Sequence, residues 1–181
     1  KESSVNEAID RTAGLVLRYN GLIVDAPYSS SCGGRSATPS EAWKGARDEP
    51  YLQNVDDLDP RTGKPYCDIS PRNHWHAEFD EGQLQEIVRR ALQAGGAAEP
   101  RPAAVHSFTV PGRSRSGRAA SVVLRTERGD VTIAARDIRA VMRDARGAIL
   151  YSTYFSVERE SRGGGRLRGL SLRGAGHGHG V

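Results

Sequence analysis

The sequence is poor in aromatic and sulfur-containing residues and lacks any long hydrophobic run. Its 181 residues include three Phe, two Trp, two Cys and one Met, so aliphatic side chains must supply most of any core. No apolar run comes near the ~20 residues that a membrane-spanning helix requires. The chain opens on a polar stretch, residues 1–10, which has no hydrophobic segment typical of a signal peptide. We therefore expect neither a transmembrane segment nor a signal peptide in this sequence.

Acidic residues are scarce in the second part of the chain. Residues 101–181 contain 15 basic and 6 acidic side chains, whereas residues 1–100 contain 11 basic and 16 acidic ones. A basic surface can bind nucleic acid, an anionic membrane or an anionic wall polymer, and it can also be merely solvated, which composition alone favours. The sequence has no RNA-binding aromatic motif, zinc-finger spacing or helix-turn-helix pattern, so a nucleic-acid partner is not expected.

Cysteine is limited to Cys32 and Cys67. Two cysteines are compatible with one disulfide, with half of a metal site or with two free thiols. His74 and His76 would complete a zinc site of Cys2His2 composition, although the spacing between Cys67 and these histidines matches no common zinc motif. The number of cysteines does not distinguish among the three states.

Periodicity, capping residues and turn signals predict the secondary structure. Asn20-Gly21 is the pair favoured in two-residue type I′ turns, and it joins two apolar runs into an expected hairpin. Asp80 is expected to cap a helix with an apolar stripe. In order, the expected elements are a helix over residues 4–12, strands over 15–19 and 22–24, loops over 27–36 and 46–73, a helix over 80–94, a linker over 97–104, strands over 105–110, 118–125 and 130–135, a helix over 136–143, and strands over 149–157 and 167–172. The pattern predicts an α+β fold of mainly antiparallel strands and hairpins with a few short helices, divided into residues 1–78 and 79–181.

Four separated segments carry sequence strings in a recognisable order. They are Tyr28-Ser29-Ser30-Ser31-Cys32-Gly33-Gly34 followed by Arg35-Ser36, then Ser40-Glu41-Ala42-Trp43 followed by Pro50-Tyr51-Leu52, then Tyr66-Cys67-Asp68-Ile69-Ser70-Pro71 with Trp75, and finally Arg115-Ser116-Gly117-Arg118 with Ser152–Val157 and Arg173–Val181. In order and spacing these strings resemble the family of stage II sporulation protein D (SpoIID) and the LytB amidase enhancer. The resemblance extends over nearly the whole chain and implies a SpoIID-like fold.

This resemblance implies a protein directed at the glycan strands of peptidoglycan, in an extracytoplasmic location. In the full-length protein the implied activity is that of a lytic transglycosylase on stripped strands. One alternative is a non-catalytic, LytB-like enhancer that binds the wall and stimulates an N-acetylmuramoyl-L-alanine amidase, and a further alternative is a basic module that binds an anionic polymer. The family's catalytic acid lies upstream of the first motif, in a string that this sequence lacks. The chain is therefore expected to be a fragment, truncated at both ends, without that acid.

The resemblance also indicates where glycan is contacted. Small side chains in the Ser- and Gly-rich loop would leave backbone amides open to a sugar, since glycine permits unusual backbone shapes. The expected glycan-binding residues are Ser29, Ser30, Ser31, Gly33, Gly34, Arg35, Trp43 and His179.

The catalytic acid is unassigned, and Glu41 and His179 are the candidates within the chain. Glu41 has an ordinary alternative role as a carboxylate near a helix N-terminus. For an exported protein, the simplest expectation is a disulfide between Cys32 and Cys67. The alternative is zinc bound at these cysteines, with His74 and His76 as further ligands. No other cofactor is expected.

Overall fold

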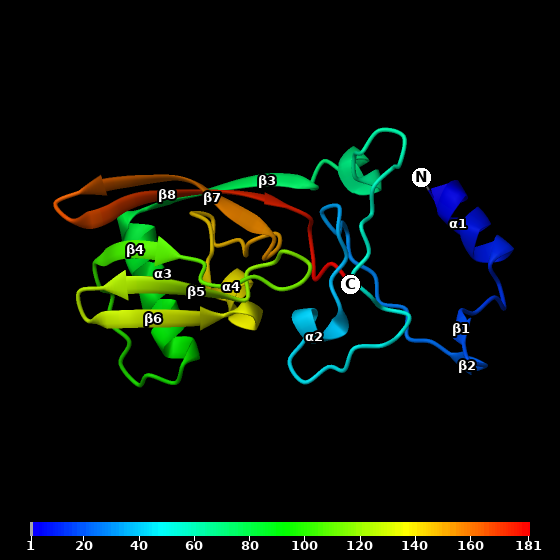
Figure 1. The fold of residues 1–181 in the computed structure, drawn as a ribbon, viewed down its shortest axis with the longest axis horizontal. Coiled ribbons are helices and arrows are strands. Elements are labelled where there is room, and N and C mark those ends of the chain that lie inside the picture. Colours follow the sequence, from blue (N-terminus) through cyan, green and yellow to red (C-terminus); the bar gives the residue numbers. More distant parts are fainter. Residues whose placement is uncertain (1) are drawn as a thin grey trace.

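Residues 2–181 are described by the computed structural model, and they form the expected α+β fold of antiparallel sheets and short helices (Figure 1). The helices are α1 (Glu2–Arg11), α2 (Pro39–Ala42), α3 (Glu81–Ala94) and α4 (Ala135–Val141), with a 3₁₀ helix, η1 (Tyr66–Ile69). The strands are β1 (Arg18–Tyr19), β2 (Leu22–Ile23), β3 (His74–Asp80), β4 (Val105–Thr109), β5 (Ser121–Thr126), β6 (Gly129–Ala134), β7 (Phe155–Gly163) and β8 (Arg166–Ala175).

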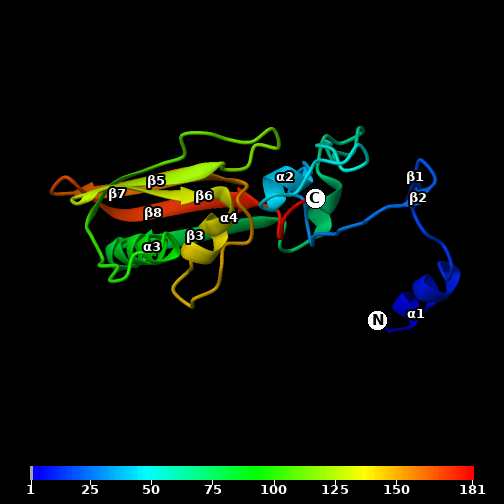
Figure 2. The same cartoon turned by 90° about the horizontal axis from the view of Figure 1, so that it is seen from below.

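Two antiparallel sheets of three strands share one hydrophobic core. In the first sheet β8 lies between β3 and β7, and in the second β5 lies between β4 and β6. Strand β4 contacts β8, and α3 packs against both sheets and against α4. Figure 2 shows α3 lying along the strands on one side of them. As the sequence predicts, the largest fully buried side chains are mainly aliphatic and include Phe79, Leu84, Ile87, Leu124, Ile138, Met142, Leu167 and Leu172.

The helix predicted over residues 80–94 is present as α3, with Asp80 as its N-cap. The Asp80 carboxylate accepts a hydrogen bond from the amide of Gln83 at 2.8 Å, and the Gln83 side chain accepts one from the amide of Asp80 at 2.9 Å. This reciprocal pair is a capping box. Leu84, Ile87 and Val88 are buried on the face of α3 that meets the sheets, as expected from their spacing.

Strands β3 and β7 differ most from the prediction. No element was predicted over residues 74–79, although this segment alternates exposed and buried residues and forms β3. The strand predicted over residues 149–157 begins only at Phe155 and extends to Gly163. Just before it the chain bends, and the Ser152 hydroxyl donates to the carbonyl of Ala175 at 2.6 Å. The expected boundary between residues 78 and 79 falls inside β3.

The N-terminal arm, residues 2–28, extends away from the two sheets (Figures 1 and 2). Its hairpin is centred on Asn20 and Gly21, whose φ angles of 49° and 80° are those of a type I′ turn. The paired strands β1 and β2 are shorter than predicted, since no further strand pairs with them among residues 2–181. Within this described range, none of the helices has the length and apolar character needed to cross a membrane.

Replacing Asp80 with Ala should lower the free energy of unfolding by about 1 kcal/mol, because the side-chain acceptor for the first turn of α3 is lost. Urea denaturation followed by circular dichroism measures the change. Asp130→Ala is the matched control, since it removes an exposed carboxylate that lies 3.5 Å from Arg125 and should change stability by less than about 0.5 kcal/mol. An equal loss in both variants would contradict a specific capping role.

Candidate functional site

The loop of residues 28–36, the C-terminal segment of residues 175–181 and the loop of residues 113–118 meet at one junction (Figure 1). Ser31 and His177 form an antiparallel bridge, with the Ser31 amide donating to the His177 carbonyl at 3.1 Å and the reverse bond at 2.8 Å. The C-terminal segment, which continues from β8, therefore joins the Ser- and Gly-rich loop to the core.

Arg118 connects the third segment to the same junction. Its guanidinium donates to the carbonyls of Cys32 at 2.8 Å and Arg35 at 3.1 Å, and the residue is only 4% exposed. Burial lowers the pKa of Arg118, while the nearby Glu41 acts in the opposite direction. Because an arginine does not lose its charge at physiological pH, the two carbonyls hold a permanent cation.

Gly33 and Gly34 are packed against other parts of the protein. Both have positive φ, +80° and +96°, which favours glycine. A Cβ on Gly33 would lie 2.9 Å from the backbone of Ala175 and 3.0 Å from the ring of Tyr154. A Cβ on Gly34 would lie 2.9 Å from Pro65. These two glycines therefore allow close contact between protein segments at the junction.

The three predicted serines differ in how accessible they are. Ser31 is buried, and its hydroxyl donates to the side-chain oxygen of the fully buried Asn73 at 2.7 Å. Ser29 is half-buried beside Gly178, and Ser30 is exposed. Of the three hydroxyl groups, that of Ser30 is thus the most open to a ligand, and Ser31 has a structural role.

Trp43 and His179, two of the predicted glycan-binding residues, lie side by side. Their ring centroids are 4.7 Å apart, and Trp43 is 39% exposed. Burial lowers the pKa of His179 despite its contact with the backbone of Tyr28, which favours the neutral imidazole. Arg35, the remaining predicted residue, lies 3.4 Å from the Asp56 carboxylate.

Glu41 is an acceptor for three donors. One carboxylate oxygen accepts from the amide of Ser116 at 3.2 Å, and the other accepts from the Asn54 side chain at 3.2 Å and the Thr38 amide at 3.3 Å. Burial alone would raise the pKa of Glu41, but these hydrogen bonds outweigh it and lower the pKa. An ionised carboxylate that connects α2 to the 113–118 loop is poorly suited to donate a proton, so its role here is structural.

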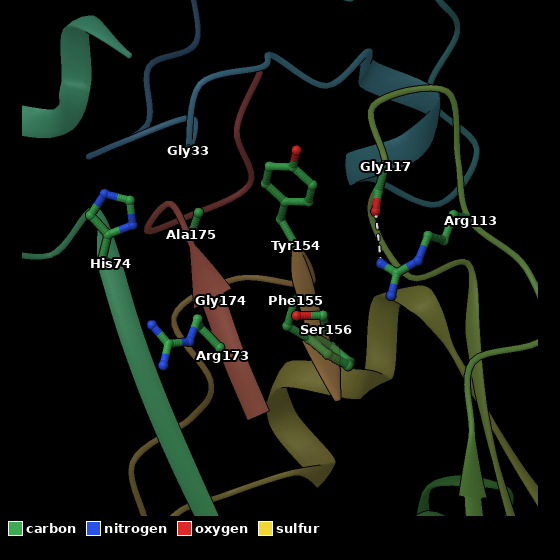
Figure 3. Close-up of a pocket in the computed structure, with 10 residues that line it drawn as sticks. All are labelled: Gly33, His74, Arg113, Gly117, Tyr154, Phe155, Ser156, Arg173, Gly174 and Ala175. Atoms are coloured by element: carbon green, nitrogen blue, oxygen red, sulfur yellow. Dashed lines mark hydrogen bonds between the residues drawn. The ribbon is translucent and has the colours of Figure 1, made fainter. Parts of the chain in front are cut away.

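A pocket of about 540 Å³ lies beside this junction, over the ends of β7 and β8 (Figure 3). It is lined by residues that include Gly33, His74, Arg113, Gly117, Tyr154 and Arg173. The sequence analysis included Gly117 and Tyr154 in the motif strings but gave them no role. Both residues lie in motif strings of the sequence, Ser-Gly-Arg and Ser-Thr-Tyr. Their proximity to Gly33 could not be predicted, because it depends on contacts between residues far apart in the sequence.

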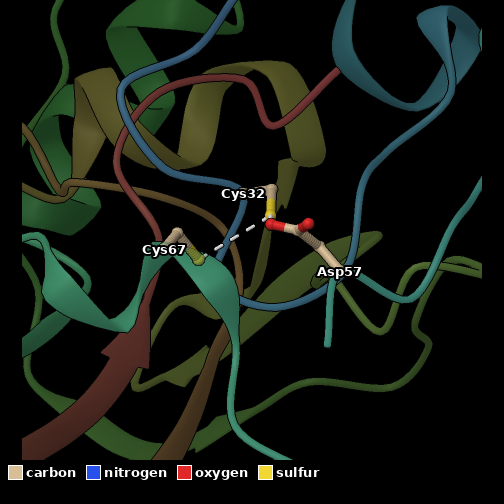
Figure 4. Close-up of side chains that lie close together, drawn as sticks. All are labelled: Cys32, Asp57 and Cys67. Atoms are coloured by element: carbon tan, nitrogen blue, oxygen red, sulfur yellow. Dashed lines mark hydrogen bonds between the residues drawn. The ribbon is translucent and has the colours of Figure 1, made fainter. Parts of the chain in front are cut away.

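Cys32, Cys67 and Asp57 form a compact cluster (Figure 4). The two sulfur atoms are 3.8 Å apart as free thiols, and the Cys32 thiol donates to the Asp57 carboxylate at 3.2 Å. Burial, with Asp57 and Cys67 close by, raises the pKa of Cys32 to about 12. Nearness of the two cysteines is compatible with the expected disulfide and with a metal site.

The donor atoms of this cluster fit zinc. Two thiolates and one carboxylate are ligand types that zinc binds, and three protein ligands would leave a fourth position open. A divalent cation would stabilise the Cys32 thiolate that burial disfavours. No role was predicted for Asp57, and the zinc alternative to the expected disulfide had named His74 and His76 as the further ligands.

The two histidines have other partners. Nε2 of His74 contacts the Asp68 carboxylate. Nε2 of His76 lies 2.7 Å from the Ser171 hydroxyl and 3.0 Å from the Glu158 carboxylate. Among residues 2–181, the group of potential metal ligands at the cysteines contains neither histidine.

Two comparisons relate the chain to known proteins. Residues 68–181 match the model of a family described as a domain of unknown function (DUF8618). The amidase enhancer of Bacillus subtilis (strain 168) is 26% identical over 211 residues, an alignment that covers 99% of this chain. The chain spans 28% of the length of that curated relative.

Under non-reducing conditions, intact-mass spectrometry should show the chain lighter by the mass of two hydrogen atoms and free of metal, as expected for a Cys32–Cys67 disulfide in an exported protein. Native mass spectrometry and thiol titration complete the measurement. Stoichiometric zinc with both thiols unoxidised would contradict the disulfide. In that case Asp57→Asn should weaken zinc binding, whereas His76→Gln, which changes a residue outside the cluster, should not.

Glu41→Gln should reduce stability in a pH-dependent way. The pKa of Glu41 in the folded protein lies below its ordinary value of 4.5, so its contribution is present above about pH 4.5 and is lost as pH falls through the folded-state pKa. The difference in free energy of unfolding between wild type and variant should be largest near neutral pH and shrink as the pH falls below about 4.5 toward the folded-state pKa. Glu99→Gln, at an exposed carboxylate 3.8 Å from Arg101, is the control. A difference that is constant with pH would contradict this role.

Proposed function

This chain belongs to the DUF8618 family, and because it is also similar along almost all of its length to an amidase enhancer, we propose that it is a peptidoglycan-binding part of an amidase-enhancer-like protein. In this proposal the chain engages the glycan strands of the wall and supports a cell-wall amidase. An extracytoplasmic location follows from that role, since peptidoglycan and its amidases lie outside the cytoplasmic membrane.

The convergence of the four motif segments carries the proposal. Ser31 of the first segment pairs with His177 of the last. Glu41 of the second accepts a hydrogen bond from Ser116, and Cys67 of the third lies beside Cys32 of the first. Segments separated by most of the chain thus form one surface, which is what a shared binding site requires.

The accessible groups of this surface are suited to a sugar. Ser30 offers an exposed hydroxyl, and Trp43 with His179 offers a pair of adjacent rings. An aromatic ring provides apolar contact area with little loss of conformational freedom, and polar groups around it set the orientation of the ligand. The charged groups of Glu41 and Arg118 are engaged within the protein, so these two side chains are not available to the sugar.

Lytic transglycosylase activity in the full-length protein, which the SpoIID resemblance implies, would need a general acid from elsewhere. Glu41 is held ionised by three donors, and burial favours the neutral form of His179. A general acid must be protonated near working pH and reach the glycosidic oxygen. The proposal for this chain is therefore binding without cleavage.

The chain should sediment with purified peptidoglycan sacculi, should accelerate their digestion by an N-acetylmuramoyl-L-alanine amidase, and should release no anhydromuramyl products alone. Trp43→Ala should weaken sacculus binding about fivefold, a loss of about 1 kcal/mol for one ring contact. Tyr19→Ala, at a residue 40% exposed on β1 and outside the four motif segments, is the control, and thermal unfolding establishes that both variants fold.

Two outcomes would contradict the proposal. Failure of the wild-type chain to bind sacculi would contradict the proposal that the chain binds peptidoglycan. Binding that disappears with moderate salt and is unaffected by Trp43→Ala would favour the alternative of an anionic-polymer module, because counterion-driven contacts weaken steeply with ionic strength. Release of anhydromuramyl products by the chain would instead show that one of its own residues supplies the acid.

A further inference from the structure

The pocket beside the junction is basic and has no acidic side chain in its lining (Figure 3). Its volume of about 540 Å³ is within the usual range for small-ligand sites. His74 and Arg173 line one side, and Arg113 lies on the opposite side, beyond Tyr154 and Ser156. A ligand in this pocket would therefore lie between cationic groups.

Arg113 is the cation whose charge is least compensated. Arg173 pairs with the Glu158 carboxylate and His74 with that of Asp68. The Arg113 guanidinium donates to the carbonyl of Gly117 at 2.9 Å, and among residues 2–181 no carboxylate forms an ion pair with it. The remaining N–H groups of this exposed residue are free to bind an anion, and a guanidinium is well matched to a carboxylate.

Tyr154 forms a rigid wall between these two sides. A Cβ on Gly33 or on Gly117 would lie 3.0 Å from its ring, and both glycines have positive φ. The Arg118 guanidinium lies 5.5 Å from the ring centroid. The ring is thus held in position, while its hydroxyl has no hydrogen-bond partner within the described part of the chain.

We propose that this pocket binds a sugar ring that carries a carboxylate, with the ring against Tyr154 and the carboxylate on Arg113. The inference rests on the proposed function and adds a ligand class to it. N-acetylmuramic acid is such a sugar and alternates with neutral N-acetylglucosamine in peptidoglycan. Its lactyl carboxyl is amide-linked to the stem peptide and becomes a free carboxylate when an N-acetylmuramoyl-L-alanine amidase hydrolyses that bond. The pocket would then recognise the acidic sugar of strands from which the amidase has removed the peptides, and fix the register of those strands.

Titration of the ¹⁵N-labelled chain with monosaccharides tests this inference by nuclear magnetic resonance. N-acetylmuramic acid should bind about tenfold more tightly than N-acetylglucosamine, as expected for one charge-assisted contact, and should shift the amide signals of Gly33 and Gly117. Arg113→Gln should abolish the preference, and Arg113→Lys should retain part of it. Arg115→Gln, at an exposed arginine of the same loop that does not line the pocket, should leave it unchanged.

The alternative outcomes are distinct. Equal affinity for the two sugars, or a preference that survives Arg113→Gln in a folded variant, would overturn the inference, and sacculus binding sensitive to Trp43→Ala would show that the proposed function still holds. Tighter binding of the acidic dipeptide L-alanyl-D-glutamate would also overturn it, because the carboxylate recognised would then come from the stem peptide. Absence of sacculus binding despite selective binding of N-acetylmuramic acid would contradict the proposed function alone.

Discussion

The buried guanidinium of Arg118 is the interaction on which the rest of the candidate site depends. A buried charge is costly unless its donors find acceptors. Here two backbone carbonyls from the Ser- and Gly-rich loop accept from the two terminal nitrogens of the guanidinium, while its Nε has no acceptor among residues 2–181. The C-terminal segment passes so close that any side chain at Gly180 would collide with this guanidinium. Arg118 also lies just before β5, which belongs to the core. One side chain therefore links the loop and the chain end to the sheets.

The site divides into groups that build it and groups that remain accessible. The first group forms hydrogen bonds within the protein through the side chains of Glu41, Ser31 and Asn73. They hold the backbone in shape, and their substitution would affect binding only through the fold. The second group has exposed surface, or N–H and O–H groups without a partner in the described part of the chain. It consists of Ser30, Trp43, Tyr154 and Arg113. This division explains why a residue type that suggests catalysis, such as the half-buried carboxylate of Glu41, does not by itself locate a catalytic site.

Local signals in the sequence predicted most of the fold but only part of the site. The capped helix α3 and the Asn20-Gly21 turn depend on neighbouring residues, and both are present. Strand β3 was missed because its partner β8 is about ninety residues away, so its alternation had no visible context. The pairing of Glu41 with Ser116 joins residues 75 positions apart, and the approach of Asp57 to the cysteines likewise follows no spacing rule. Those contacts exist only once the sheets are formed.

Strand β8 is the central strand of its sheet, and the C-terminal segment that follows it forms part of the candidate site. It pairs in register with β3 from Gly169 to Ala175, and the next residues form the bridge to Ser31. A shift of one residue would reverse which face each side chain occupies, moving Arg173 to the core side and displacing the glycines that contact the loop. The register of β3 and β8 thus determines where the residues that follow β8 meet the Ser- and Gly-rich loop. The position of the site residues on this segment is therefore set by strand pairing within the buried core.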